Sequence, residues 1–123
     1  MVKPPAILVV EDDPYIQHMV EDGLAEGGFQ PAIVSSAEEA ITLLQADQSY
    51  RALVMDINLG GAMDGWQAAK RAREINPNLS IVYMTAGAGA EWPAQGVPKS
   101  ILLQKPFAVA QLVTAVSQLL NAG

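Results

Sequence analysis

The sequence predicts an α/β fold in which helices cover both faces of a parallel β-sheet. Five short apolar runs alternate with longer segments whose apolar residues recur every three or four positions, the spacing of a helix that buries one face. Most of the runs are continuously apolar, which is typical of strands buried on both faces of a parallel sheet. Strands and helices that alternate along a chain form right-handed βαβ units, so we expect a single sheet of this kind.

The strands are expected at these apolar runs, and the second strand should be more exposed than the others. The runs occupy residues 6–10, 29–34, 52–58, 81–84 and 101–103.

Capping residues mark where helices begin and end. Asp13 followed by Pro14 is an N-cap with proline at the first helical position, and Gly27-Gly28 ends that helix. The next two helices begin at capping boxes, Ser36 with Glu39 and Asp64 with Gln67. The apolar faces expected on the four clear helices are Ile16, Met19, Val20 and Leu24; Ala37, Ala40, Ile41 and Leu44; Trp66, Ala69 and Ala72; and Val109, Leu112, Val113, Val116 and Leu120.

Between the fourth and fifth strands the pattern is irregular. This stretch contains Gly89, Pro93, Gly96 and Pro98, all of which are unfavourable inside a helix. We therefore expect at most a short or irregular fourth helix.

Composition limits the class of protein. The length of 123 residues and the hydrophobic content of 50% predict one folded domain spanning residues 1–123. The absence of cysteine excludes disulfides and thiolate metal sites. The net charge of −6 argues against binding to nucleic acid and favours cations or basic partners. The apolar run at residues 6–10 is too short for a signal peptide or a membrane span, so we expect a soluble cytoplasmic protein with no membrane partner.

Charged and hydroxyl side chains lie at the ends of four predicted strands. They are Glu11 and Asp12 after the first strand, Asp56 in the third, Thr85 after the fourth and Lys105 after the fifth. Parallel α/β sheets bind ligands at the carboxyl ends of their strands, so we expect these side chains to converge on one pocket.

Three carboxylates in one pocket need compensation. Two like charges about 4 Å apart repel by about 4 kcal/mol at an effective dielectric constant of about 20. Protonation of one carboxyl or binding of a divalent cation relieves this repulsion. Oxygen ligands with no His or Cys nearby favour Mg²⁺ over zinc. A carboxylate such as Asp56 beside Mg²⁺ and Lys105 is equipped to accept a phosphoryl group, and Thr85 can donate a hydrogen bond to that group.

Four motifs resemble those of response-regulator receiver domains. VVEDDP, VMDIN, YMTAG and LLQKPF occur in the order and at the spacings of that family, and the resemblance extends over essentially the whole chain. The resemblance implies a flavodoxin-like fold, a doubly wound sheet with the strand order 2-1-3-4-5. It also implies two-component signalling, in which a sensor histidine kinase or a histidine phosphotransfer protein donates the phosphoryl group.

The resemblance further implies a Mg²⁺ site around the phosphoacceptor Asp56. Asp12 would bind the cation directly, Glu11 through a water molecule, and Asn58 through its backbone carbonyl.

The resemblance assigns two more side chains to the phosphoryl group. Thr85 would be the switch hydroxyl and Lys105 the cation that pairs with the phosphate. The Lys105-Pro106 peptide bond is expected to be cis.

The sequence departs from the common receiver pattern in three places. Gly60-Gly61 stands where proline is frequent, and the loop there is one residue longer. Leu102 stands three residues before Lys105, where Tyr or Phe is frequent. The segment after Thr85 lacks a clear helix. The mechanism of the switch and its output surface therefore stay open.

Other prominent residues have structural interpretations. Asp64 is a helix cap, His18 a surface or partly buried side chain, and Trp66 a packing residue. Trp92 lies in the irregular segment and either packs or contacts a partner. Residues 86–89 lack the Gly-Lys-Ser/Thr ending of a phosphate-binding loop, which excludes that function.

The preferred hypothesis is a stand-alone receiver that signals through phosphorylation-dependent contacts with a downstream protein. It is not expected to be an enzyme beyond self-catalysed phosphotransfer and autodephosphorylation. A phosphate-independent interaction module, a phosphorelay intermediate, a phosphate sink and a fragment of a hybrid kinase stay open as alternatives. An aspartyl phosphohydrolase would need a cap domain and an acid-base Asp at the position of Asn58, so we expect no turnover of phosphate esters.

Overall fold

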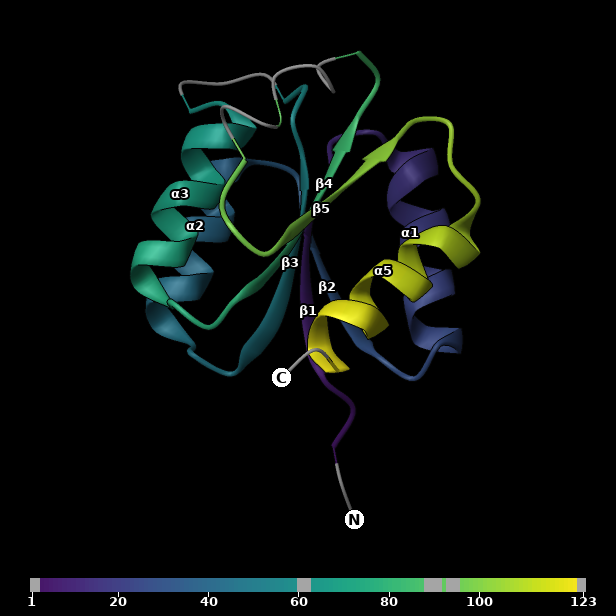
Figure 1. Ribbon diagram of the computed structural model, residues 1–123, viewed down its shortest axis with the longest axis horizontal. Helices are drawn as coiled ribbons and strands as arrows, with labels where there is room; N and C mark the ends of the chain where they lie inside the picture. Colours follow the sequence, from purple (N-terminus) through teal and green to yellow (C-terminus); the bar gives the residue numbers. More distant parts are fainter. Residues whose placement is uncertain (1–2, 60–62, 88–91, 93–95, 122–123) are drawn as a thin grey trace.

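A five-stranded parallel sheet forms the centre of the computed structural model, which describes residues 3–59, 63–87, 92 and 96–121. The strand order is β2-β1-β3-β4-β5, as predicted, and every neighbouring pair is parallel (Figure 1). The strands are β1 (Ala6–Val10), β2 (Gln30–Val34), β3 (Tyr50–Asp56), β4 (Ser80–Thr85) and β5 (Ser100–Gln104).

Strand boundaries differ from the predicted ones by one or two residues. β3 begins at Tyr50 and ends at Asp56, while β4 and β5 each include the residue on either side of the apolar run. Tyr50 extends β3 because it pairs with Ala6 across an irregularity in the register between β1 and β3. This pairing is a contact between segments far apart in the sequence, so it cannot be predicted from the local pattern of apolar residues.

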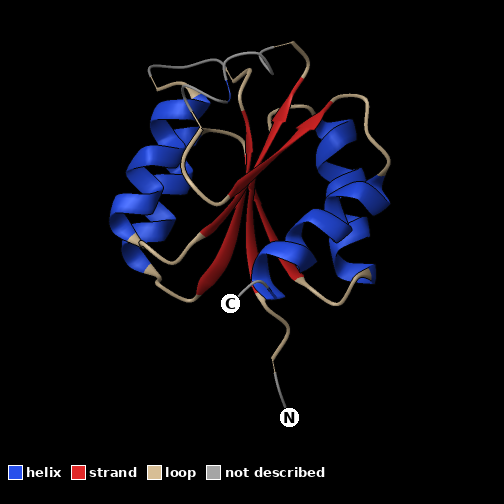
Figure 2. Ribbon diagram, in the orientation of Figure 1, coloured by secondary structure: helices blue, strands red, loops and turns tan. Residues whose placement is uncertain are grey.

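Four helices flank the sheet in the described part of the chain, and Figure 2 shows them in two layers. They are α1 (Pro14–Glu26), α2 (Ala37–Ala46), α3 (Gly65–Ile75) and α5 (Val109–Asn121). α1 and α5 cover one face of the sheet, and α2 and α3 cover the other (Figure 1), which confirms the doubly wound prediction. The predicted irregular fourth helix and the Gly60-Gly61 turn fall mainly on residues 88–91, 93–95 and 60–62, outside the described residues.

The sheet separates two apolar cores. Successive side chains of a strand point to opposite faces, so Leu8 and Leu53 pack with α2 and α3, whereas Ile7 and Val54 pack with α1 and α5. The central strands β1, β3 and β4 are almost fully buried, and the edge strands β2 and β5 are partly exposed. The greater exposure expected for the second strand is therefore confirmed. Because β1, β3 and β4 are neighbours in a parallel sheet, their carboxyl ends lie next to one another.

The helix caps largely follow the prediction. The Asp13 side chain accepts a hydrogen bond from the Tyr15 N–H at 2.9 Å. At the start of α3 the capping box is complete, because Asp64 accepts from the Gln67 N–H at 2.8 Å and Gln67 accepts from the Asp64 N–H at 3.2 Å. These caps fix where α1 and α3 leave the end of the sheet that carries Asp56.

The capping box predicted at Ser36 is only half formed. The Ser36 hydroxyl accepts from the Glu39 N–H at 3.2 Å, as expected. The Glu39 carboxylate, however, accepts from the N–H of Ser35 at 3.4 Å. The carboxylate therefore satisfies a backbone donor one residue earlier than in a standard box.

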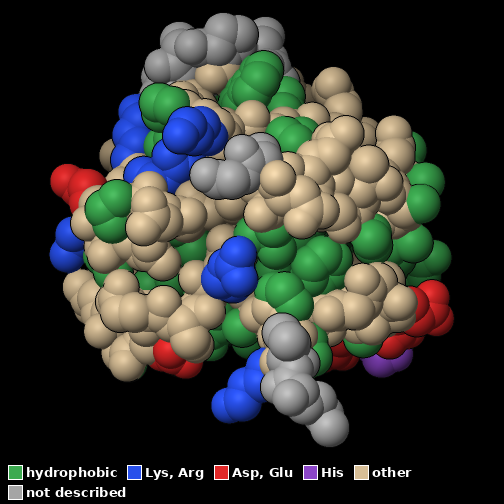
Figure 3. Space-filling view, turned by 60° about the horizontal axis from the view of Figure 1, so that its bottom comes forward, with side chains coloured by type: hydrophobic (Ala, Val, Ile, Leu, Met, Phe, Trp, Pro, Cys, Tyr) green, Lys and Arg blue, Asp and Glu red, His purple; other side chains and the backbone are tan. Residues whose placement is uncertain are grey.

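The strands begin at the end of the molecule opposite to the acidic residues that follow β1 and β3, and the surface of this opposite end is largely apolar at its centre (Figure 3). Figure 3 turns this end toward the viewer and shows hydrophobic side chains near the middle, with most acidic side chains near the rim. Among the helices of the described ranges, none has the length and apolar character needed to cross a membrane.

Candidate functional site

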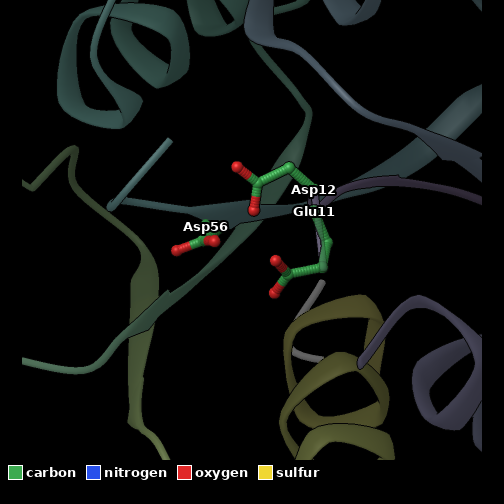
Figure 4. Close-up of side chains that lie close together, drawn as sticks. All are labelled: Glu11, Asp12 and Asp56. Atoms are coloured by element: carbon green, nitrogen blue, oxygen red, sulfur yellow. The ribbon is translucent and has the colours of Figure 1, made fainter. Parts of the chain in front are cut away.

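Three carboxylates meet where β1 and β3 end. Glu11 and Asp12 follow β1, Asp56 is the last residue of β3, and one carboxylate oxygen from each lies within 4.8 Å of the others (Figure 4). Glu11 is fully buried and Asp56 is 2% exposed, whereas Asp12 is open to solvent. The predicted convergence of these residues is confirmed.

Local hydrogen bonds hold the acidic loop in place. The Glu11 N–H donates to the Val34 carbonyl of β2 at 3.1 Å, which continues the sheet by one residue. The Glu11 carboxylate accepts from the Asp13 N–H at 3.1 Å. From α1, the Gln17 side-chain amide donates to the Glu11 carbonyl at 2.5 Å and to the Ser35 hydroxyl at 3.3 Å. Gln17 was not identified from the sequence, where it is an ordinary polar residue on a helix.

Lys105 joins the buried carboxylates. Its Nζ lies 2.8 Å from Glu11 Oε1 and 3.3 Å from Asp56 Oδ2, and its side chain is 16% exposed. The Lys105-Pro106 bond is cis, as expected. The backbone of Lys105 is anchored at the end of β4, where its N–H donates to the Thr85 carbonyl at 2.7 Å. The cation therefore sits between the ends of β1 and β3.

Burial and charge act in opposite directions at this cluster. Burial raises the pKa of Glu11 and Asp56 raises it further, and the hydrogen bonds from Lys105 and the Asp13 N–H do not fully offset this. For Lys105, burial alone would lower the pKa, but its hydrogen bonds and its attraction to Glu11 and Asp56 outweigh burial and raise it. Lys105 therefore stays protonated, but its single charge does not fully compensate the carboxylates of Glu11, Asp12 and Asp56.

The hydroxyl of Thr85, at the end of β4, is linked to Asp56 through Asn58. Thr85 is fully buried, and its Oγ1 donates to the side-chain oxygen of Asn58 at 3.3 Å. That oxygen also accepts from the Ala86 N–H at 3.1 Å. The Asn58 N–H in turn donates to Asp56 Oδ1 at 3.0 Å. The sequence suggested only the backbone carbonyl of Asn58, so this role of its side chain is a finding of the structure.

The donor set fits a hard divalent cation. All the grouped side-chain ligands are carboxylate oxygens, which Mg²⁺ prefers. The exposed Asp12 leaves one side of the group accessible to solvent, as a cation that retains several water molecules requires. The cluster also has more negative charges than Lys105 alone can balance.

The other residues singled out in the sequence lie away from this cluster or support it. His18 is exposed on α1, and Asp64 caps α3. Trp66 packs in the core against Tyr83, with ring centroids 4.7 Å apart. The Trp92 indole donates to the Ser100 hydroxyl at 3.1 Å. Asp64, Trp66 and Trp92 therefore have structural roles in the folded domain.

Leu102 occupies the β5 position at which receivers often carry an aromatic residue. It is partly buried and packs against the core formed with α2 and α3. An aromatic switch side chain is therefore absent from this position.

Comparisons with known proteins agree with this arrangement. The chain matches the response regulator receiver domain family over residues 7–117. The response regulator receiver protein CpdR of Brucella abortus is 30% identical over 118 residues, which cover 94% of this chain and 97% of that protein. The transcriptional regulatory protein HprR of Escherichia coli is 30% identical over 112 residues, which cover 89% of this chain and 49% of that protein. The chain thus spans about half the length of that regulator.

Solved structures share the fold. The crystal structure of a response regulator receiver protein from Sinorhizobium medicae matches with a TM-score of 0.93 and 45% identity, over 98% of this chain and 97% of that one. The receiver domain of a sensor histidine kinase from Pseudomonas aeruginosa, solved with a magnesium ion in its active-site cleft, matches with a TM-score of 0.81 and 26% identity, over 95% and 98% of the two chains. From its fold, its converging motifs and these matches, the chain belongs to the response regulator receiver domain family of two-component systems.

Proposed function

We propose that this receiver domain accepts a phosphoryl group on Asp56 from the phosphohistidine of a sensor histidine kinase or a histidine phosphotransfer protein. The phosphorylated form then signals in the cytoplasm by changing its contacts with a downstream protein. The observation that carries this proposal is the position of Asp56, a nearly buried carboxylate 3.3 Å from Lys105 Nζ and grouped with Glu11 and Asp12.

The reaction needs a nucleophile and compensation for charge. A carboxylate oxygen of Asp56 forms a bond to phosphorus as the bond from phosphorus to the imidazole nitrogen breaks, and the leaving imidazole takes a proton from solvent. Lys105 pairs with the phosphoryl oxygens, and the Thr85 hydroxyl donates to one of them. Mg²⁺, held by Asp12 and Asp56, by Glu11 through water and by the Asn58 carbonyl, would supply further neutralisation of the transferred oxygens.

A small phosphodonor tests the assignment of Asp56. Acetyl phosphate with Mg²⁺ should add one phosphate to the wild-type protein, measured as intact mass, and none to Asp56→Asn. Asp64→Asn is the matched control, because Asp64 caps α3 and its carboxylate is engaged there. We expect this control to be modified as the wild type is. Equal modification of Asp56→Asn and the wild type would overturn the proposal.

A further inference from the structure

We propose that the side chain of Asn58 is a positioning residue that holds the Thr85 hydroxyl in its resting place and has to release it when Asp56 carries a phosphoryl group. This inference rests on the proposed function, since it concerns how the modified Asp56 is read.

The hydrogen bonds determine which atom of Asn58 faces Thr85. The Ala86 N–H can only donate, and it lies 3.1 Å from the same Asn58 atom that lies 3.3 Å from Thr85 Oγ1. The oxygen of the amide must therefore face both groups, and the opposite orientation of the amide would place two donors against each other. The Thr85 hydroxyl thus donates its single proton to Asn58.

Asn58 also senses the phosphoacceptor. Its backbone N–H donates to Asp56 Oδ1 at 3.0 Å, so one residue binds both the proposed nucleophile and the switch hydroxyl. The Gly87 N–H donates to Thr85 Oγ1 at 3.2 Å, which ties the first residues after β4 to the same hydroxyl. A change in the partner of Thr85 is therefore transmitted to the backbone of Ala86 and Gly87.

A phosphoryl group on Asp56 would compete with Asn58 for one proton. Its charged oxygens accept hydrogen bonds more strongly than a neutral amide oxygen does. The hydroxyl then leaves Asn58, and the strength of the resting bond sets how readily the switch responds. Leu102 stands where an aromatic residue is usual in β5, so the Asn58 amide, and not an aromatic side chain at that position, is the contact that a phosphoryl group would displace.

Beryllofluoride, a phosphoryl mimic, provides the test. With saturating Mg²⁺, we expect Asn58→Ala to bind beryllofluoride about two- to tenfold more tightly than the wild type, the range given by the loss of one competing neutral hydrogen bond. In the unliganded variant, the amide resonance of Gly87 should already have moved toward its beryllofluoride-bound position. A role in structure alone would not produce that shift.

A double-mutant cycle with Thr85→Ala isolates the proposed contact. If Asn58 acts through the hydroxyl, Asn58→Ala changes the affinity in the wild-type background and in Thr85→Ser, but has no effect in Thr85→Ala. Asn58→Asp keeps the shape of the side chain but offers the Thr85 hydroxyl a charged acceptor. We therefore expect Asn58→Asp to bind beryllofluoride more weakly than the wild type, so its coupling energy with Thr85→Ala should have the opposite sign to that of Asn58→Ala. This second variant keeps the test decisive if Asn58→Ala folds poorly.

The outcomes separate the two proposals. Failure of the wild type to bind beryllofluoride, or equal binding by Asp56→Asn, would overturn the proposed function. Normal binding by the wild type, with an Asn58 effect of the same size in the Thr85→Ala background, would overturn only the role of Asn58.

Discussion

At the residue scale, Lys105 is one cation set against two buried carboxylates. Its pKa is raised because Glu11 and Asp56 outweigh the effect of burial, which alone would lower it. A lysine whose folded pKa is raised contributes stability that is fully present below its ordinary pKa of 10.5 and is lost as the pH rises through the folded pKa. Lys105 should therefore stabilise the fold at neutral pH as well as serve the phosphoryl group.

Replacing this cation tests that contribution. Lys105→Met should lower the free energy of unfolding at pH 7 without Mg²⁺ by about 1–3 kcal/mol, less than for a fully enclosed pair because the lysine is partly exposed. Urea unfolding measures the change, with the exposed Lys99→Met as control. The difference in unfolding free energy between the wild type and Lys105→Met should become smaller above pH 10.5, because Lys105 then begins to lose its charge. An unchanged unfolding free energy at pH 7 would show that the lysine does not compensate the carboxylates.

At the scale of elements, α1 and α5 approach each other through glycine. Gly23 is buried, and a Cβ there would overlap Val109 Cγ2 of α5. A Cβ at Gly27 would lie 2.8 Å from Val113 Cγ1. Glycine within a helix costs about 1 kcal/mol relative to alanine. The close packing of α1 against α5 explains why position 23 of α1 is a glycine despite this cost.

Gly23→Ala should therefore destabilise the protein despite the better helix propensity of alanine. We expect a loss of about 1–3 kcal/mol in the free energy of unfolding, because an extra methyl group has to be accommodated in a filled contact. Val109→Ala as a second change opens the space, so the double variant should lose less than the sum of the two single variants. A more stable Gly23→Ala protein would contradict the packing described here.

At the scale of the whole molecule, the parallel sheet and the acidic cluster could be predicted from the sequence pattern, and the strand order from the resemblance to receiver domains. Apolar runs alternating with helical patterns indicate parallel strands, and such strands bring Glu11, Asp56 and Lys105 to one edge of the sheet. The bond between Asn58 and Thr85, residues 27 apart, could not be predicted, because it depends on the exact separation of two loops. The contact of Gln17 with the Glu11 carbonyl was also missed, because in the sequence Gln17 is an ordinary polar residue on a helix.

The charge of the whole chain leads to the last prediction. The protein has a net charge of −6, and three of its carboxylates are grouped together, two of them in ion pairs with a single lysine. A ligand that binds only the folded state stabilises it by about 2.7 kcal/mol at 100 times its Kd. The thermal unfolding midpoint of the wild type should therefore rise with Mg²⁺ concentration, beyond the effect of NaCl at equal ionic strength.

Asp12→Asn should lose most of this response to Mg²⁺, because it removes the solvent-facing carboxylate of the cluster and leaves the ion pairs of Lys105 intact. Asp47→Asn is the matched control, since Asp47 is also exposed but lies at the end of α2, away from the cluster. General screening of negative charge would affect the two variants equally. If Mg²⁺ raised the unfolding midpoints of Asp12→Asn and Asp47→Asn equally, the acidic cluster would not be the site at which Mg²⁺ binds. A loss confined to Asp12→Asn would link the stability of the whole domain to the same carboxylates that are proposed to prepare Asp56 for phosphorylation.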